Sequence, residues 1–352
     1  MPSLLPEASP VAARIERLLG RKVRSLGRLR GGRNSRVYLA SADGDQRFIV
    51  KRYFRHPSDR RDRLGVEFGG LKFLWKRGMR CIPEPIAADP AGGLALYRQV
   101  DGSPIRGSNV AEEDIRQAVR FLADLKALSR LTAARALPPA SEACFSVAAI
   151  VRNLRLRLAA LTPSSARTPS HAALRDFVKR DLEPSVHDFG AWSRSRLTHA
   201  RISYAAPLKR AERTLSPSDF GFHNALRDRS GGIIFLDFEY FGWDDPAKAI
   251  SDFLLHPAMR LCRDHKVRFV EGCLDRLDAT GHLAARLSAV FPLFGLKWCM
   301  ILLNEFVPRL RLRRDFAAGR QASEDVLDRQ LEKARRMLCQ VKRDMDPFRY
   351  HG

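Results

Sequence analysis

The chain has 352 residues, of which 45% are hydrophobic, and it carries a formal net charge of +23 at pH 7. This length allows one large domain or two ordinary ones with a sizeable core. No apolar run reaches the roughly 18 residues that a membrane span needs, and the N-terminus lacks the pattern of a secretory signal, so we expect a cytoplasmic globular protein. The six scattered cysteines form no CxxC pair, which argues against zinc and favours reduced thiols.

The first hundred residues are expected to form a small antiparallel sheet with one internal helix. The predicted elements are, in chain order, a helix over 7–19, strands over 23–29, 37–42 and 48–53, a helix over 59–77, and strands over 86–88 and 94–100. Gly31 and Gly32 lie in the turn between the first two strands, where exposed backbone N–H groups can approach phosphates.

After residue 100 the pattern becomes mainly helical. Asp101-Gly102-Ser103-Pro104 interrupts the chain, so we expect a hinge over 101–108 between an N-terminal lobe, 1–100, and a helical lobe, 109–352. The predicted helices cover 111–131, 147–161 and much of 171–213, with breaks near Pro184 and Pro207, and nearly everything from Ala247 onward. The apolar run from Phe291 to Phe306 has the pattern of a buried helix.

One stretch gathers acidic side chains in this basic chain: SPSDFGFHNALRDRSGGIIFLDFEYFGWDDP, from Ser216 to Pro246. A turn at Ser230-Gly231-Gly232 is expected to fold Asp237 back beside Asn224. Oxygen ligands of this kind suit Mg²⁺, which proteins usually hold with one or two side chains together with substrate phosphates. Asp219 is then available to orient or deprotonate a hydroxyl group.

A phosphate site also needs positive charge. Lys51 lies in the third predicted strand, and Glu67 lies on the helix that follows. Because its neighbours Val66 and Phe68 are apolar, we expect Glu67 to face inward and to hold Lys51 in an ion pair.

The order Lys51, Glu67, Asp219-x-x-x-x-Asn224 and Asp237 resembles the protein kinase-like fold, and in its details the aminoglycoside phosphotransferase family. The block from Asp219 to Asn224 is similar to the family's catalytic loop, and Leu236-Asp237-Phe238-Glu239 to its metal-binding strand. The segment from Asp245-Pro246 to Ser251-Asp252 and the hinge Val100-Asp101-Gly102 are also similar. The resemblance covers roughly residues 20–310.

The resemblance implies an α+β, two-lobed fold with a small antiparallel nucleotide-binding lobe and a larger helical lobe. It implies a kinase that uses ATP or GTP with Mg²⁺ to phosphorylate a hydroxyl of a sugar-like or other small metabolite. Asp219 is then the catalytic carboxylate, Asn224 and Asp237 hold Mg²⁺, and Asp252 braces the catalytic loop. The residues implied to contact nucleotide are Gly31, Gly32, Ser35, Lys51 with its partner Glu67, and the backbone of Arg98 and Val100.

The chain departs from the family pattern at Pro217-Ser218, where the family often has His-Gly, and this puts the support of the loop in question. Several roles stay open. His223 packs against or hydrogen-bonds the loop, or it acts as a base. The acidic residues Glu239, Asp244 and Asp245 line an acceptor pocket or cap the next helix. The aromatic residues Tyr240, Phe241 and Trp243 are core or a platform for a ring-bearing substrate.

Two other functions stay open beside the kinase. A nucleotide-binding pseudokinase could act as a scaffold or regulator. A nucleic-acid-binding protein would account for the charge, but the sequence contains no zinc finger, RNA-recognition or helix-turn-helix pattern. For a kinase, the positive charge favours a neutral or anionic acceptor such as a sugar over a cationic aminoglycoside. The missing Ala-Pro-Glu segment after Asp237 argues against protein substrates.

Overall fold

The computed structural model describes residues 9–29, 35–44, 46–57, 59, 61–161, 168–278, 280–308 and 324–345. The chain divides into two compact units. The described part of the first unit lies within 9–104 and 224–241, and that of the second within 105–223, 242–308 and 324–345. The boundary after Pro104 falls inside the predicted hinge, but segment 224–241 groups with the first unit, whereas chain order predicts it in the second.

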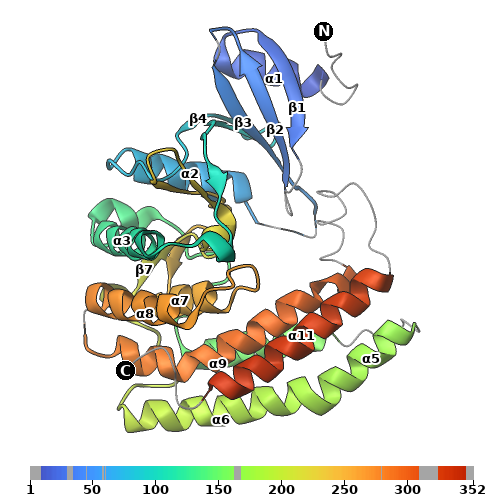
Figure 1. The fold of residues 1–352 in the computed structure, drawn as a ribbon, viewed down its shortest axis with the longest axis vertical. Helices are drawn as coiled ribbons and strands as arrows, with labels where there is room; N and C mark the ends of the chain where they lie inside the picture. Colours follow the sequence, from blue (N-terminus) through green and yellow to red (C-terminus); the bar gives the residue numbers. More distant parts are fainter. Residues whose placement is uncertain are drawn as a thin grey trace. The chain divides into compact units, whose positions relative to one another are not determined.

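The first unit contains a five-stranded antiparallel sheet with the order β1-β2-β3-β5-β4 (Figure 1). The bounds are Ser9–Leu19 for α1, Val23–Leu29 for β1, Ser35–Ala42 for β2, Arg47–Tyr53 for β3, Arg63–Trp75 for α2, Pro85–Asp89 for β4 and Leu94–Arg98 for β5. Tyr38, Val50 and Leu96 pair across three strands and are buried in one core cluster with Ile15 of α1. Because side chains alternate along a strand, Lys51 points to the other face.

Helix α2 begins at Arg63, four residues later than predicted. The Asp62 side chain accepts a hydrogen bond from the Gly65 N–H and caps the first turn. Asp59 instead lies in a turn with His56, and its N–H donates to the His56 carbonyl at 2.9 Å. The helix ends at Trp75, and Gly78 follows with a φ of +85°, consistent with the predicted stop.

The predicted hairpin within 224–241 is present. Strand β8 (Ala225–Arg227) pairs with β9 (Ile233–Phe235) and with the short β6 (Ser103–Pro104). In the turn, Asp228 accepts hydrogen bonds from the N–H groups of Ser230 and Gly232, and Gly231 has a φ of +88°. This turn chemistry fixes the register of the hairpin.

The second unit is built mainly of helices. Their bounds are Glu112–Ser129 for α3, Val147–Ala160 for α4, Pro169–Phe177 for α5, Glu183–His199 for α6, Pro246–Leu255 for α7, Arg263–Leu277 for α8, Leu283–Leu302 for α9 and Glu324–Asp344 for α11. Helix α9 packs against α6, α7 and α11, and Figure 1 shows it beside α11. Its buried face confirms the predicted core helix.

By length and composition, one helical segment among the described residues, Leu283–Phe306, could cross a membrane. It has 78% of its most apolar window buried inside the structure. A core helix meets the same criteria, so the segment is weak evidence for a membrane span.

The prediction of a helix break near Pro184 is wrong. Helices α5 and α6 are joined by a π-helical turn, Val178–Leu182, and Pro184 lies in the first turn of α6. Proline is tolerated there because its missing N–H falls at a place where the regular bonding pattern already changes. The helix ends at His199, before Pro207.

Two short buried strands of the second unit flank the acidic stretch. β7 (Thr214–Ser216) precedes Asp219, and β10 (Gly242–Asp244) precedes α7; they pair in antiparallel fashion. The Asp245 side chain caps α7 by accepting a hydrogen bond from the Ala247 N–H. Asp244 and Asp245 are fully buried; the capping role is correct for Asp245, whereas Asp244 pairs with Lys248.

Candidate active site

In the first unit, Lys51 connects two carboxylates. Its Nζ lies 2.7 Å from Glu67 Oε1 and 2.9 Å from Asp237 Oδ1. The predicted ion pair with Glu67 is therefore confirmed. Burial alone would lower the pKa of Lys51, but Asp237 and Glu67 outweigh that effect and raise the pKa well above its usual value. The ammonium group is therefore charged at neutral pH.

Glu67 is held by more than Lys51. It faces inward, as expected, and is only 2% exposed. The Tyr53 hydroxyl donates to Glu67 Oε2 at 2.7 Å, and the Phe238 N–H donates to Oε1 at 3.2 Å. Glu67 therefore ties β3, α2 and the segment after β9 to one carboxylate.

Asp237 is the exposed member of this group. Its side chain is 34% exposed, and its backbone is left-handed, with a φ of +66°. Such a conformation is uncommon outside glycine, and asparagine and aspartate tolerate it best. The bend turns the chain at the end of β9 and aims the carboxylate at Lys51. Strained backbone of this kind is often found at functional sites.

The hairpin brings Asn224 and Asp237 to the same end of the two strands. Ala225 pairs with Phe235, and the Leu236 N–H donates to the Asn224 carbonyl at 2.8 Å. An amide and a partly exposed carboxylate beside a lysine form the hard oxygen donor set that Mg²⁺ prefers. These residues therefore fit a magnesium ion.

The other predicted nucleotide contacts are placed as follows. Gly31 and Gly32 lie outside the described residues. Ser35 is buried at the start of β2, opposite Tyr53. The Arg98 N–H donates to the Glu84 carbonyl at 2.9 Å, so this donor is already engaged. Within the described ranges no hydrogen bond of the Val100 backbone occurs.

Glu239 is buried rather than lining an open pocket. Its exposure is 2%, and its Oε2 lies 3.8 Å from the Nε of Arg63, which is equally buried. Burial, with the nearby Asp237 carboxylate, raises the pKa of Glu239 to about 7. Phe241 and Trp243 are core as well: a Cβ built on Gly70 would lie 2.5 Å from the ring of Phe241, and the Trp243 indole donates to the Ala134 carbonyl. Tyr240 is half-buried, and the Arg61 guanidinium lies over its ring.

In the second unit, Asp219 lies in a loop that is held at both ends. His223 Nε2 lies 3.1 Å from Asp219 Oδ1, so His223 hydrogen-bonds the loop. On the other side, Ser218 has a φ of +69°, and its Oγ accepts a hydrogen bond from Lys248 Nζ at 2.9 Å. Asp252 acts on the loop through Lys248, because Asp252 Oδ2 lies 3.0 Å from Lys248 Nζ.

Sequence reasoning did not single out Lys248. A readable signal exists, because Asp244, Lys248 and Asp252 are four residues apart, the spacing of one helical face. In the structure Asp244 ends β10, and Lys248 and Asp252 lie on α7. Lys248 Nζ lies 2.7 Å from Asp244 Oδ2, and both side chains are almost fully buried.

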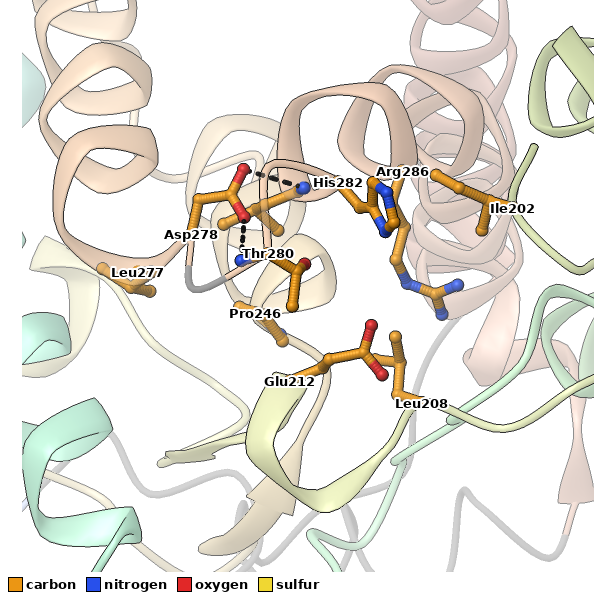
Figure 2. Close-up of a pocket in the computed structure, with 10 residues that line it drawn as sticks. Ile202, Leu208, Glu212, Pro246, Leu277, Asp278, Thr280, His282 and Arg286 are labelled. Atoms are coloured by element: carbon orange, nitrogen blue, oxygen red, sulfur yellow. Dashed lines mark hydrogen bonds between the residues drawn. The ribbon is translucent and has the colours of Figure 1, made fainter. Parts of the chain in front are cut away.

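Figure 2 shows a pocket of the second unit, lined among others by Glu212, Asp278, His282 and Arg286. Asp278 accepts hydrogen bonds there from the N–H groups of Thr280 and Leu283. The cavity volume is about 40 Å³, room for a few water molecules. This pocket is too small for a nucleotide or a sugar.

The chain matches known proteins in sequence pattern and in fold. The model of the phosphotransferase enzyme family matches residues 25–287. No curated protein sequence matches the chain. Choline kinase LicA from Streptococcus pneumoniae is 14% identical with a TM-score of 0.60, and the match covers 95% of this chain and 99% of that one.

Two further solved structures are similar. Spectinomycin phosphotransferase APH(9)-Ia, in complex with ADP and spectinomycin, has a TM-score of 0.63 at 11% identity, with 95% and 98% of the two chains covered. A choline/ethanolamine kinase family protein from Mesorhizobium loti has a TM-score of 0.57 at 18% identity, with 97% and 99% covered. These likenesses confirm the two-lobed protein kinase-like fold. With the family match over more than half of its length, the chain belongs to the phosphotransferase enzyme family, as its resemblance to the aminoglycoside phosphotransferases implies.

Proposed function

We propose that the protein is an ATP-dependent small-molecule O-phosphotransferase, with GTP as a second nucleotide to be tested. The observation that carries this proposal is the cluster in the first unit. There a charged lysine lies within 2.9 Å of a buried and a partly exposed carboxylate. This combination places one cation for phosphate oxygens and one carboxylate for a metal ion in a single compact group. The fold likeness to a phosphotransferase bound to ADP supports it.

Each residue of this cluster has a proposed role. Lys51 binds the nucleotide phosphates, and Glu67 keeps its ammonium group in place. Asn224 and Asp237 hold Mg²⁺, which when bound would neutralise phosphate charge. Gly31, Gly32 and Ser35 contact the phosphates through the strand turn, and the backbone of Arg98 and Val100 contacts the base. For Val100 the absence of a backbone hydrogen bond in the described part of the chain supports this role.

Asp219 is the proposed catalytic residue. It orients the acceptor hydroxyl and accepts its proton as the oxygen bonds to the γ-phosphorus, while the bond from that phosphorus to the β–γ bridging oxygen breaks and ADP leaves. Positioning and charge neutralisation supply most of the rate in such transfers.

The acceptor is a small molecule with a hydroxyl group. The formal charge of +23 disfavours a polycationic acceptor, so a neutral or anionic sugar or a similar metabolite is the first class to test. We place the enzyme in the cytoplasm, where ATP is available.

The first test measures nucleotide binding and transfer in matched variants. Calorimetric titration of ATP should show Mg²⁺-dependent binding to the wild type and its loss in Asp237→Ala. Asp43→Ala is the matched control, since Asp43 is a half-exposed carboxylate of the same unit whose partner is the exposed Arg24. Asp219→Asn should still bind Mg·ATP but transfer phosphate at least about 10³-fold more slowly.

Two outcomes would contradict the proposal. Full turnover in Asp219→Asn would show that another group does the chemistry. Tight Mg·ATP binding by the wild type, without transfer to any acceptor or to water, would favour the pseudokinase instead.

A further inference from the structure

Side chains of the second unit form a closed chain of contacts that begins and ends at the catalytic loop. It runs from Asp219 through His223, His256 and Trp298 to Asp252, and through Lys248 back to Ser218, the residue before Asp219. Its members come from the loop, from α7, from the residue after α7 and from α9. Two sides of this chain of contacts reach the loop independently.

The first side is ionic. Lys248 Nζ donates to Ser218 Oγ at 2.9 Å and is neutralised by Asp244 at 2.7 Å and Asp252 at 3.0 Å. The three charged side chains are at most 6% exposed. A buried ammonium group with this geometry is fixed in place, because any movement would leave a charge unpaired. Ser218 meanwhile has a left-handed backbone, which an L-residue keeps only when its surroundings hold it.

The second side is aromatic. His223 bonds to Asp219 Oδ1 at 3.1 Å, and its ring lies on that of His256 with centroids 3.5 Å apart and planes 3° apart. The rings of His256 and Trp298 are nearly perpendicular, with centroids 4.6 Å apart, and the Trp298 indole N–H donates to Asp252 Oδ1 at 2.9 Å. The orientation of the His223 ring is therefore set by His256, and His256 is in turn held by Trp298.

A metal ion does not explain the histidine pair. One ligand atom each from Asp219, His223 and His256 lies within 4.8 Å of the others. An imidazole binds a metal along a lone pair in its own ring plane. Parallel rings 3.5 Å apart point their lone pairs along parallel planes, so a single ion cannot lie in both. The stacked geometry favours packing.

We propose that Lys248 and His256 are positioning residues that hold Asp219 in its reactive orientation from two sides. This inference rests on the proposed function, because it assigns the role of Asp219. Neither residue touches the reacting atoms: Lys248 acts through Ser218, and His256 acts through His223. Small displacements of a catalytic group are expensive, since about 1 Å can cost about 10²-fold in rate.

The test uses substitutions that remove one contact and leave the fold. Ser218→Ala keeps the Cβ and its backbone strain but removes the acceptor of the Lys248 bond. Ser193→Ala is its control, because Ser193 also makes one buried hydrogen bond of the same unit, to the Ala289 carbonyl at 2.6 Å. His256→Phe keeps a flat ring over His223, whereas His256→Leu keeps apolar volume without the ring. Both lose the hydrogen bond that His256 Nδ1 accepts from the Ala258 N–H.

The readout is phosphate release from Mg·ATP with water as acceptor, measured with the melting temperature and with hydrogen exchange of the peptide 214–224. Ser218→Ala and His256→Leu should lower kcat about ten- to a hundredfold, with the KM for ATP within about twofold. Exchange of the peptide should be faster in both. Ser193→Ala and His256→Phe should retain the wild-type kcat within about threefold.

The outcomes distinguish a failure of the positioning roles from a failure of the proposed function. If the wild type releases phosphate but Ser218→Ala and His256→Leu keep its kcat and its exchange rate, the positioning roles are wrong and the proposed function stands. Equal losses in His256→Phe and His256→Leu would exclude the stack as the cause. A wild type that neither binds Mg·ATP nor releases phosphate would overturn the proposed function, and the positioning roles with it.

Discussion

Lys51 and Lys248 each lie close to two carboxylates at similar distances, but the carboxylates differ in their exposure to water. Lys51 in the first unit lies 2.7 and 2.9 Å from two carboxylates, and Lys248 in the second unit lies 2.7 and 3.0 Å from two others. The difference is exposure: Asp237 beside Lys51 is 34% exposed, whereas neither carboxylate beside Lys248 exceeds 6%. The distances alone do not reveal which cluster binds a ligand.

The comparison shows that burial decides what an ion-paired lysine can do. A cluster that water reaches can exchange a carboxylate for phosphate oxygens or a metal ion at modest cost. A sealed cluster cannot, because each charge that loses its partner stays desolvated. We therefore assign ligand binding to the Lys51 cluster and loop support to the Lys248 cluster, and Lys248→Met and Lys51→Met test that division.

The largest effect is expected for Lys248→Met. Removing the ammonium group leaves Asp244 and Asp252 buried without their common cation, which should lower the free energy of unfolding by about 3–5 kcal/mol. Urea denaturation followed by circular dichroism measures it. If the free energy of unfolding falls by less than about 1 kcal/mol, water reaches the Lys248 cluster, and burial does not distinguish it from the Lys51 cluster.

The next effect concerns Glu239, a buried carboxylate of the first unit that lies 3.8 Å from the cation of Arg63. Its pKa is raised from 4.5 to about 7, so the native state keeps a proton that the unfolded chain has lost. The contribution of Glu239 to the free energy of unfolding should therefore fall as the pH rises from about 4.5 to about 7. Glu239→Gln should remove about 2 kcal/mol of this pH dependence between pH 5 and pH 8.

Denaturation curves of Glu239→Gln and the wild type at several pH values give that difference directly. Asp43→Asn is the matched control, because Asp43 is a half-exposed carboxylate of the same unit. If the wild type instead gains stability relative to Glu239→Gln as the pH rises, Arg63 keeps Glu239 charged.

Lys51→Met should lower the free energy of unfolding less than Lys248→Met does, because only one of the two carboxylates beside Lys51 is buried. Asp237 can turn toward water, and Glu67 keeps its bonds from Tyr53 and Phe238. Mg·ATP binding measured by calorimetry should nevertheless be lost. If this variant unfolds as readily as Lys248→Met while it still binds nucleotide, the two clusters have been assigned the wrong way round.

The sequence predicted the parts of this molecule that depend on short-range patterns. The strands of the first unit, the hairpin turn and the Lys51–Glu67 pair follow from alternation, turn residues and one apolar helix face. The grouping of 224–241 with the first unit, the π-helical turn before Pro184 and the contacts of Lys248 were not predicted. The grouping of 224–241 and the bond from Lys248 to Ser218 depend on packing between segments far apart in the chain, which local propensity does not encode.

The departure at Pro217-Ser218 is instructive in the same way. Because the family's histidine and glycine are absent, the sequence alone did not show what supports the loop. In the structure the Lys248 side chain, 30 residues downstream, donates a hydrogen bond to Ser218. The spacing of Asp244, Lys248 and Asp252 was visible in the sequence, but nothing local shows that this helix face is buried against the loop.

The left-handed backbone at Asp237 limits which amino acids can occupy this position. Among acidic residues only aspartate adopts that conformation with little cost, because its short side chain can bond to nearby backbone groups. A glutamate would carry the same charge but would meet a steric penalty of about 1–2 kcal/mol before any ligand arrives. The chemistry of the site and the geometry of the chain therefore select the same amino acid for independent reasons.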